Sequence, residues 1–288
     1  MKNIYFIFFA MMLTALSCSK AGDVRPENPD VIRFQIGFPE TKASATAFEK
    51  GDAVSLYAVE QYGEVAIPLQ VGGNYINNEK LSFDGASWNT DYTLYWADNP
   101  CDFYGIYPYI PSIGSIETYP FAVATNQNGE GYEASDLLFA YTPLVTRSKG
   151  PVSLQFKHIL SKLVVVLNKG EQFEGEIPDD IVANVYNTVN TCSVDFTHGS
   201  VEKDLMGERK TIQMHKISNQ RFEAILVPQN LERKTPLVEL TMGGIAYLME
   251  YSLSFRAGYV HTLNITLNTS PDQEMIGISI DVDNDGWN

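Results

Sequence analysis

The chain contains little cysteine, only Cys18, Cys101 and Cys192 among 288 residues. No Cys-x-x-Cys pair and no Cys/His cluster occurs, which excludes cysteine-based zinc sites. If Cys18 is modified as argued below, only the other two remain. A disulfide between them and two separate buried thiols both fit the composition, and we expect separate thiols because the two residues fall in different expected domains.

Positive charge is also scarce. The chain has 20 Lys+Arg against 35 Asp+Glu, a formal net charge of -15 and a pI of about 4.6. A nucleic-acid-binding surface must neutralise phosphates with basic side chains, so nucleic acid is excluded as a partner. The 44% of hydrophobic residues is enough for a sizeable folded core.

Known catalytic motifs are absent as well, including Gly-x-Ser-x-Gly, His-Glu-x-x-His and the glycine-rich phosphate loops. The four histidines are scattered along the chain. His158 shares the parity of Leu154 and Phe156, so we interpret it as a buried, hydrogen-bonded core residue. We therefore expect no enzyme, no catalytic residue and no cofactor.

One short string has the pattern of a metal-binding loop. DVDNDG at 281–286 matches the opening of a calcium loop, but the sequence ends at Asn288, before the bidentate glutamate that completes such a loop. We interpret it as a polar chain end and expect no metal, while the calcium interpretation stays open.

Long apolar runs are missing except near the N-terminus. The run Ile4 to Leu13 follows Lys2 and is too short to span a bilayer, which takes about 20 apolar residues. Its order of basic start, apolar middle and small-residue exit is that of a secretory signal. The stretch ALSC at 15–18 resembles a bacterial lipobox. We therefore predict a signal peptide over 1–17, cleavage between Ser17 and Cys18, and lipid attachment to Cys18. An ordinary signal peptide and a buried N-terminal strand are the alternatives.

What the chain does contain is strand patterning. Residues 18–30 are polar and proline-containing, as in a tether. In VIRFQIGF, apolar residues Ile32, Phe34, Ile36 and Phe38 alternate with others, which predicts a strand with one buried face. Similar runs recur between glycine and proline signals, and no long amphipathic helix is evident. The sequence predicts an all-β sandwich or barrel.

The clearest hairpin is LVELTMGGIAYLMEY, whose Gly243-Gly244 pair can supply the positive φ angles of a two-residue turn. Folding the chain there predicts three apolar cross-strand pairs: Met242 with Ile245, Leu240 with Tyr247, and Val238 with Met249. In DDIVANVYNTVNTC the spacing also fits a helix, but its valines, threonines and asparagines favour strand–turn–strand.

The apolar parity changes near the middle of the chain. In SLQFKHILSKLVVVLN, Leu154 and Phe156 share one parity, whereas Leu163 and Val165 share the other. Such a change indicates a bulge or a strand that passes from one sheet to another. We place a domain boundary close by, which predicts an N-terminal β-sandwich over 31–150 and a C-terminal β-sandwich over 151–288.

Aromatic residues make up 12% of the chain, a content that also occurs in carbohydrate-binding surfaces. Most lie on the apolar parity of strands, so core packing is the expected role. Tyr104 and Tyr132 are the two that we select as candidates for exposure.

Several stretches together resemble the Bacteroidetes fimbrillin family of the Mfa-like kind, which includes major fimbrial subunits. They are ETKASATAFEKGDAVSLYA, YWADNPCDFYGIYPY, SDLLFAY with VSLQFKHILSKLVVVL, and AILVPQNL with FRAGYVHTLNITL. Each is weak alone, but their order is specific, and they cover nearly the whole mature chain.

This resemblance implies two tandem transthyretin-like β-sandwich domains and a lipoprotein exported to the outer membrane and cell surface. In family pilus subunits a protease removes the lipidated N-terminal strand, and a strand from a neighbouring subunit fills the opened groove by β-strand complementation. Here VIRFQIGF would be the removable strand, with processing at Lys42, where the family more often has arginine, or at Arg33. The segment MIGISIDVDNDGWN would be the donated strand.

The resulting hypothesis is a fimbrial subunit or pilus-associated adhesin. Its partners would be other pilus subunits, the outer membrane through the lipid, and a host or bacterial surface receptor. The alternative is a surface glycan-binding lipoprotein of a nutrient uptake system, and a secreted hydrolase is a more distant third.

Overall fold

The computed structural model describes residues 30–38, 48–63, 65–232, 235–269 and 278–287. This part of the chain is almost entirely β-structure, and its one α-helix is the single turn α1 (Glu130–Glu133). The prediction of an all-β fold is therefore confirmed. None of the described residues form a helix long and apolar enough to cross a membrane.

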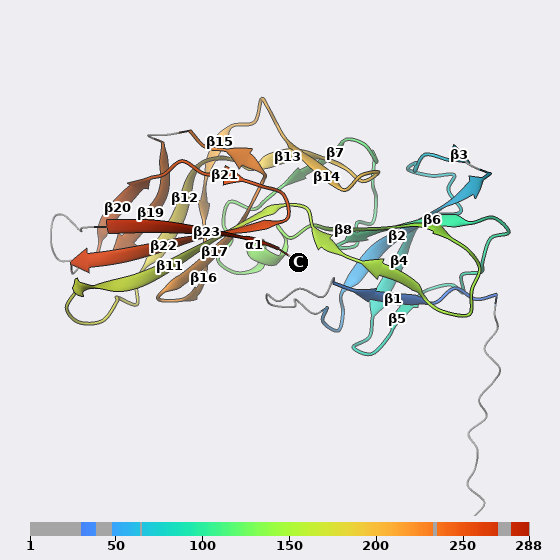
Figure 1. Ribbon diagram of the computed structural model, residues 1–288, viewed down its shortest axis with the longest axis horizontal. Coiled ribbons are helices and arrows are strands. Elements are labelled where there is room, and N and C mark those ends of the chain that lie inside the picture. The colour runs from blue at the N-terminus through green and yellow to red at the C-terminus, as the bar shows by residue number, and fades with distance from the viewer. Residues whose placement is uncertain (1–29, 39–47, 64, 233–234, 270–277, 288) are drawn as a thin grey trace, which may run out of the picture.

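One end of the molecule is built around an antiparallel sheet (Figure 1). In spatial order its strands are β10 (Lys157–His158), β8 (Leu138–Val145), β6 (Cys101–Tyr107), β2 (Ala53–Tyr62), β4 (Ile76–Phe83) and β5 (Trp88–Thr90), and β3 (Val65–Ala66) pairs with β2. Both faces of this sheet are covered. On β2, Leu56 and Ala58 belong to one apolar cluster, whereas Tyr57 and Val59 belong to another.

A two-stranded parallel sheet covers one face. It consists of β1 (Phe34–Gly37) and β9 (Val152–Gln155), with Phe34 opposite Val152 and Ile36 opposite Leu154. The strand predicted for VIRFQIGF is confirmed, and its side chains alternate between the buried and the exposed face. Ile32, Phe34, Ile36 and Phe38 belong to or pack on the apolar cluster, whereas Arg33 is exposed, because successive side chains point to opposite faces.

The other end of the molecule holds four more sheets. The five-stranded sheet is β16 (His215–Ser218), β17 (Arg221–Leu226), β11 (Ser161–Gln172), β22 (Tyr259–Thr269) and β23 (Ile278–Gly286). The four-stranded sheet is β15 (Arg209–Gln213), β12 (Val182–Val189), β19 (Pro236–Met242) and β20 (Ile245–Glu250). The small sheets are β14 (Ser200–Lys203), β13 (Thr191–Asp195) and β7 (Tyr119–Ala122), and β18 (Gln229–Asn230) with β21 (Ser254–Phe255).

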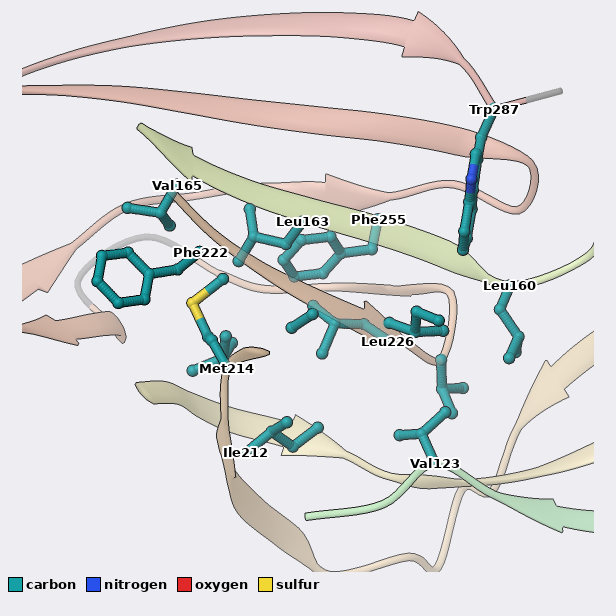
Figure 2. Close-up of a cluster of buried hydrophobic side chains, with 14 of the residues drawn as sticks. Val123, Leu160, Leu163, Val165, Ile212, Met214, Phe222, Leu226, Phe255 and Trp287 are labelled. Carbon is teal, nitrogen blue, oxygen red and sulfur yellow. The ribbon is translucent and has the colours of Figure 1, made fainter. Parts of the chain in front are cut away.

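A core of apolar side chains fills the space between the two larger sheets at this end. Figure 2 shows Leu163 of β11 and Phe222 of β17 near Met214 and Ile212, and all four side chains are buried. Burying a side chain of this size contributes roughly 1.5–3 kcal/mol, so such a core supplies most of the force that holds the sheets together.

The Gly243-Gly244 hairpin forms with the predicted register. Strands β19 and β20 pair Met242 with Ile245, Leu240 with Tyr247, and Val238 with Met249. Both glycines have positive φ, 56° at Gly243 and 79° at Gly244, as a two-residue turn of this kind requires. The cross-strand register was predictable because the turn and the apolar parity both lie within one short stretch.

The change of apolar parity near residue 160 marks a passage between sheets, as predicted. His158 ends β10, which pairs with β8, and Ser161 begins β11, which pairs with β17 and β22. Two other segments link the halves of the sequence: β9 pairs with β1, and β7 pairs with β13.

The segment DDIVANVYNTVNTC forms strand β12 and the start of β13, with an irregularity at Asn187, so the strand interpretation is confirmed and the helical alternative is wrong. The expected turn is also wrong. Only Asn190 separates β12 from β13, and the chain passes there from one sheet into another without reversing on itself.

The C-terminal strand ends against a buried histidine. The Trp287 ring stacks on the His158 ring with centroids 3.8 Å apart and planes at 8°, and Phe38 lies 6.1 Å from the same ring. Nδ1 of His158 is 2.9 Å from Oδ1 of Asp136, which confirms the prediction of a buried, hydrogen-bonded residue. Trp287, labelled in Figure 2, is 8% exposed, so it fixes the end of β23.

Replacing this anchor should loosen β23. We expect Trp287→Ala to weaken the local structure by roughly 1–3 kcal/mol, because a large buried ring is lost at the end of an edge strand. Hydrogen–deuterium exchange should become at least about tenfold faster in residues 278–286. Tyr92→Ala, which removes a 72% exposed ring, is the matched control. Unchanged exchange in β23 would contradict the anchoring role.

Close packing of β6 against Phe156 gives a second prediction. A Cβ added at Gly105 would lie 2.5 Å from the Phe156 ring, whereas Gly114 has no atom within 4 Å of such a position. We expect Gly105→Ala to lower the free energy of unfolding by about 1–3 kcal/mol and Gly114→Ala to leave it nearly unchanged. Chemical denaturation measures both. Adding Phe156→Leu should recover part of the loss, and a fully additive double variant would refute the clash.

Candidate functional site

The most distinctive feature of the surface is how the first strand is held. β1 is a short strand on the outside of the molecule, attached to β9 by a parallel ladder. The Val152 amide donates to the Arg33 carbonyl at 2.7 Å, and the Phe156 amide donates to the Gly37 carbonyl at 2.8 Å. These bonds fix the register of β1 along one edge only.

The inner face of β1 closes an apolar core. Phe34 packs edge-on against Phe103 with ring centroids 6.0 Å apart, and Phe38 stacks on Phe48 at 4.9 Å. Beneath them, Leu154 and Phe103 are fully buried. If β1 left, this apolar surface would be uncovered, and a strand with the same alternation could cover it again.

The second edge of β1 borders an open groove of about 1090 Å³. Among the described residues, this edge is paired only at its beginning, where the Ile32 amide donates to the Leu94 carbonyl at 2.8 Å and the Trp96 amide donates to the Asp30 carbonyl at 2.9 Å. Residues 31–38 form one wall of the groove and residues 86–94 form much of the opposite wall. Sequence reasoning did not identify this groove, because its walls come from separate parts of the chain.

Of the predicted processing and lipidation residues, the structure describes only Arg33. Its side chain is exposed and its Nη2 donates to the Lys149 carbonyl, while its own carbonyl is bonded to β9. Ser17, Cys18 and Lys42 lie outside the described residues.

The C-terminal segment, which the sequence indicated as a donated strand, is paired within its own chain. β23 runs antiparallel to β22, with Ile280 opposite Ile265 and Val282 opposite Leu263. Its odd-numbered residues 281, 283 and 285 are aspartates on the exposed face. It is an edge strand, with β22 as its neighbour.

The string DVDNDG lies inside this strand and does not form a loop. In an extended chain, side chains on the same face are about 6.6–6.8 Å apart, which separates the carboxylates that a calcium loop would bring together. Asp283 instead accepts a hydrogen bond from Nδ2 of Asn264 at 3.0 Å. Within the described residues, no group of three or more His, Cys, Asp or Glu side chains is arranged to hold a metal ion.

The cysteines are separate buried thiols, as predicted. Cys101 and Cys192 are both free and almost inaccessible to solvent. Burial raises the pKa of Cys101 to about 11 and that of Cys192 to about 12, because a thiolate is poorly solvated there. Neither is set up as a nucleophile.

The expectation of exposed rings at Tyr104 and Tyr132 is wrong. Tyr104 is buried on β6, whose sheet is covered on both faces, so parity does not distinguish an outer side there. Tyr132 is half-buried, and its hydroxyl donates to Oε2 of Glu223 at 2.7 Å. Among the described residues, the exposed tyrosine rings are instead those of Tyr62, Tyr75, Tyr92, Tyr95 and Tyr141.

Comparison with known proteins gives a family match over most of the chain. The family model described as fimbrillin-like matches residues 41–284. No curated protein sequence matches the chain.

Solved structures share the fold at low identity. A proposed cell adhesion protein from Bacteroides uniformis ATCC 8492 has a TM-score of 0.66 at 20% identity, covering 84% of this chain and 93% of that one. A second, from Bacteroides ovatus ATCC 8483, has a TM-score of 0.68 at 16% identity, covering 90% and 98%. A fimbrial protein from Bacteroides vulgatus ATCC 8482 has a TM-score of 0.52 at 13% identity, covering 90% and 100%.

These structures show a common all-β fold over nearly the full length of each chain. The family model extends over most of the sequence, from residue 41, which follows β1, to residue 284 within β23. The chain belongs to the fimbrillin-like family.

Proposed function

We propose that the chain is a cell-surface fimbrial subunit or a pilus-associated adhesin, which joins its neighbours by exchange of β-strands. Family membership supports the fimbrial role. The observation that carries strand exchange is the position of β1. This strand closes an apolar core, and the described residues pair with only part of its outer edge. The role is structural and needs no catalysis.

The proposed architecture is two transthyretin-like β-sandwiches, over 31–150 and 151–288. The two larger groups of sheets support this division. In this arrangement β9 and β10 complete the first sandwich although they follow residue 150, and β7 contributes a strand to the second. Each sandwich thus takes a segment from the other half of the sequence, which ties the two together.

The proposed route to the surface begins with signal residues 1–17 and cleavage between Ser17 and Cys18. Lipid on Cys18 holds the chain at the outer membrane, and the tether 18–30 separates the folded part from the bilayer. Pilus subunits and a surface receptor are the proposed partners.

Processing is proposed after β1, at Lys42, or at Arg33. The geometry favours the former, because a protease binds its substrate as an extended, unpaired segment and the Arg33 carbonyl is already bonded to the Val152 amide. A cut at Lys42 separates β1 from the rest of the chain while leaving it seated. Its release then depends on non-covalent contacts, which include those of residues 30–38.

Limited proteolysis tests this proposal. With a lysine-specific protease we expect one early cut at Lys42, followed by oligomers as β1 is exchanged for a strand of another molecule. Mass spectrometry locates the cut and size-exclusion chromatography with light scattering follows assembly. Lys42→Gln should stop both, whereas Lys50→Gln, at an exposed lysine beyond the loop, should stop neither.

A synthetic peptide of residues 30–38 serves as the competitor. Added in excess to the cut protein, it should refill the position of β1 and suppress oligomers. Cut protein that releases β1 yet stays monomeric at every concentration would refute strand exchange.

A second function, binding of surface glycans, is favoured by one cluster of exposed tyrosines. The Tyr75 hydroxyl donates to the Tyr95 carbonyl at 2.8 Å, and the Tyr62 hydroxyl lies 3.3 Å from Oε2 of Glu60. Exposed rings beside carboxylates can stack on sugars and bond their hydroxyls. Affinity gel electrophoresis with polysaccharides tests it: retardation lost in Tyr95→Ala would support glycan binding, and no retardation with any polysaccharide would exclude it.

A further inference from the structure

The loop between β14 and β15 carries the two most exposed large apolar side chains among the described residues. Leu205 is 87% exposed and Met206 is 91% exposed. They are the central pair of a turn, in which the Gly207 amide donates to the Asp204 carbonyl at 3.2 Å. Exposed turns normally have small or polar residues in these places, so the turn itself does not require this pair. Figure 1 shows the loop projecting from the sheets. We call the two side chains the knob.

The knob is held in a fixed position by Asp204. Oδ1 of Asp204 accepts a hydrogen bond from the Met206 amide at 2.9 Å, and Oδ2 accepts one from the Thr191 hydroxyl at 3.1 Å. The Asp204 amide in turn donates to the Thr191 carbonyl at 3.0 Å. Because these bonds tie the turn to β13, the knob loses little conformational freedom when it binds a partner.

A pocket of about 460 Å³ lies beside the knob, on the outer face of the small sheet of β7, β13 and β14. Short side chains form its floor, with Pro120 opposite Ser193 and Ala122 opposite Thr191, and none of the four is buried. They leave space above the sheet that apolar side chains from another molecule can fill. Thr191 of the floor bonds Asp204 of the turn, so pocket and knob are immediate neighbours.

We propose that the knob of one copy of the chain enters the pocket of a second copy, and that the second copy does the same in return. A two-fold axis that passes between knob and pocket places each knob in the other molecule's pocket. The contact then closes at two molecules, as in other isologous dimers. It needs neither the removal of β1 nor any cleavage, so it goes beyond the proposed strand exchange and joins subunits side by side.

The charge around the knob favours a second copy as the partner. Segment 202–210, EKDLMGERK, has three acidic and three basic residues and therefore no net charge, whereas the whole chain has a formal net charge of -15. Two copies repel each other through this net charge, and the repulsion is weakest where the facing segments are neutral. The knob is thus the centre of an apolar and locally neutral patch with charged residues of both signs at its rim, as is usual in protein interfaces.

A bilayer fits this patch less well than a protein pocket does. Anionic headgroups attract clusters of basic residues, and a segment without net charge offers them no such attraction. Two apolar side chains also bury less surface than one acyl chain, whose hold on a membrane is already marginal. Membrane binding is therefore an outcome for the test to exclude.

Sedimentation analysis of the uncut protein tests the proposal. The protein is residues 19–288 with Lys42→Gln, so that neither a thiol at residue 18 nor cleavage in the loop after β1 joins the molecules. We expect a reversible dimer. Its association should strengthen as salt is added, because salt screens the repulsion between two acidic molecules.

Variants of the knob locate the contact. Leu205→Ser combined with Met206→Ser should weaken dimerisation at least about tenfold, because both apolar anchors are lost. The matched control is Leu248→Ser combined with Ile217→Ser. These side chains are 53% and 51% exposed and lie on β20 and β16, away from the small sheet, so the control should dimerise normally.

A mixing experiment tests the reciprocal geometry. Ala122→Tyr, at an exposed position of the edge strand β7, should fill the pocket and leave the knob intact. The knob variant keeps its pocket, so each variant alone lacks both contacts. Mixed together, the two retain one knob-in-pocket contact and should form a heterodimer at least about threefold tighter than either homodimer. Anisotropy of one labelled variant measures it.

Three results would overturn the proposal. Uncut protein that stays monomeric at every concentration would exclude the dimer, while strand exchange, which follows cleavage, would be unaffected. A dimer of full strength in the knob variant, or no gain on mixing, would place the contact elsewhere. Monomeric protein that binds phospholipid vesicles through the knob would replace the second copy by a bilayer.

Discussion

The parallel pairing of β1 with β9 is the constraint on which much of the structure depends. It joins the start of the folded chain to a strand that begins at Val152 and closes the core around Phe103 and Phe156. The segment that receives β1 then continues through β10 into β11, the strand that lies between β17 and β22. One continuous stretch of backbone therefore does two things. Its β9 segment pairs with β1, and its β10 and β11 segments link the two ends of the molecule.

The energetics of this pairing are compatible with the proposed exchange of the first strand. β1 has four residues and one ladder, and each net hydrogen bond contributes about 1 kcal/mol, whereas each buried apolar side chain contributes roughly 1.5–3 kcal/mol. The inner-face residues Ile32, Phe34, Ile36 and Phe38 thus supply most of the attachment. Attachment of this kind depends on alternation and size more than on a particular sequence, so another strand with the same parity can take the position at little net cost. The covalent link to β2 adds to this attachment, because it keeps the local concentration of β1 high.

Short sequence patterns predicted which residues form strands and which face of each strand is buried. Only the structure shows which strands that are distant in the sequence pair with one another. The register of β19 and β20, the buried face of β1 and the change of sheet near His158 each follow from a few consecutive residues. The pairing of β1 with β9 and the groove do not, because they join segments that no sequence periodicity relates. Tyr104 was misassigned because its sheet is buried on both faces, where alternation carries no information. Trp287 follows an acidic run that is typical of a solvated chain end. The burial of Trp287 is explained only by its stacking on His158, which is distant in the sequence.

The two strands near the ends of the chain meet at that histidine. Phe38 directly follows β1, Trp287 directly follows β23, and both rings lie within stacking range of the His158 ring. His158 itself is fixed by Asp136 and sits where the chain passes from β10 to β11. Departure of either strand removes one aromatic neighbour from a buried ring and weakens the packing of the other. The contacts that hold β1 and those that hold β23 are thus energetically coupled, since neighbouring groups that share a partner do not contribute additively. A molecule built in this way holds both strands while both are present and holds each less firmly once the other has gone.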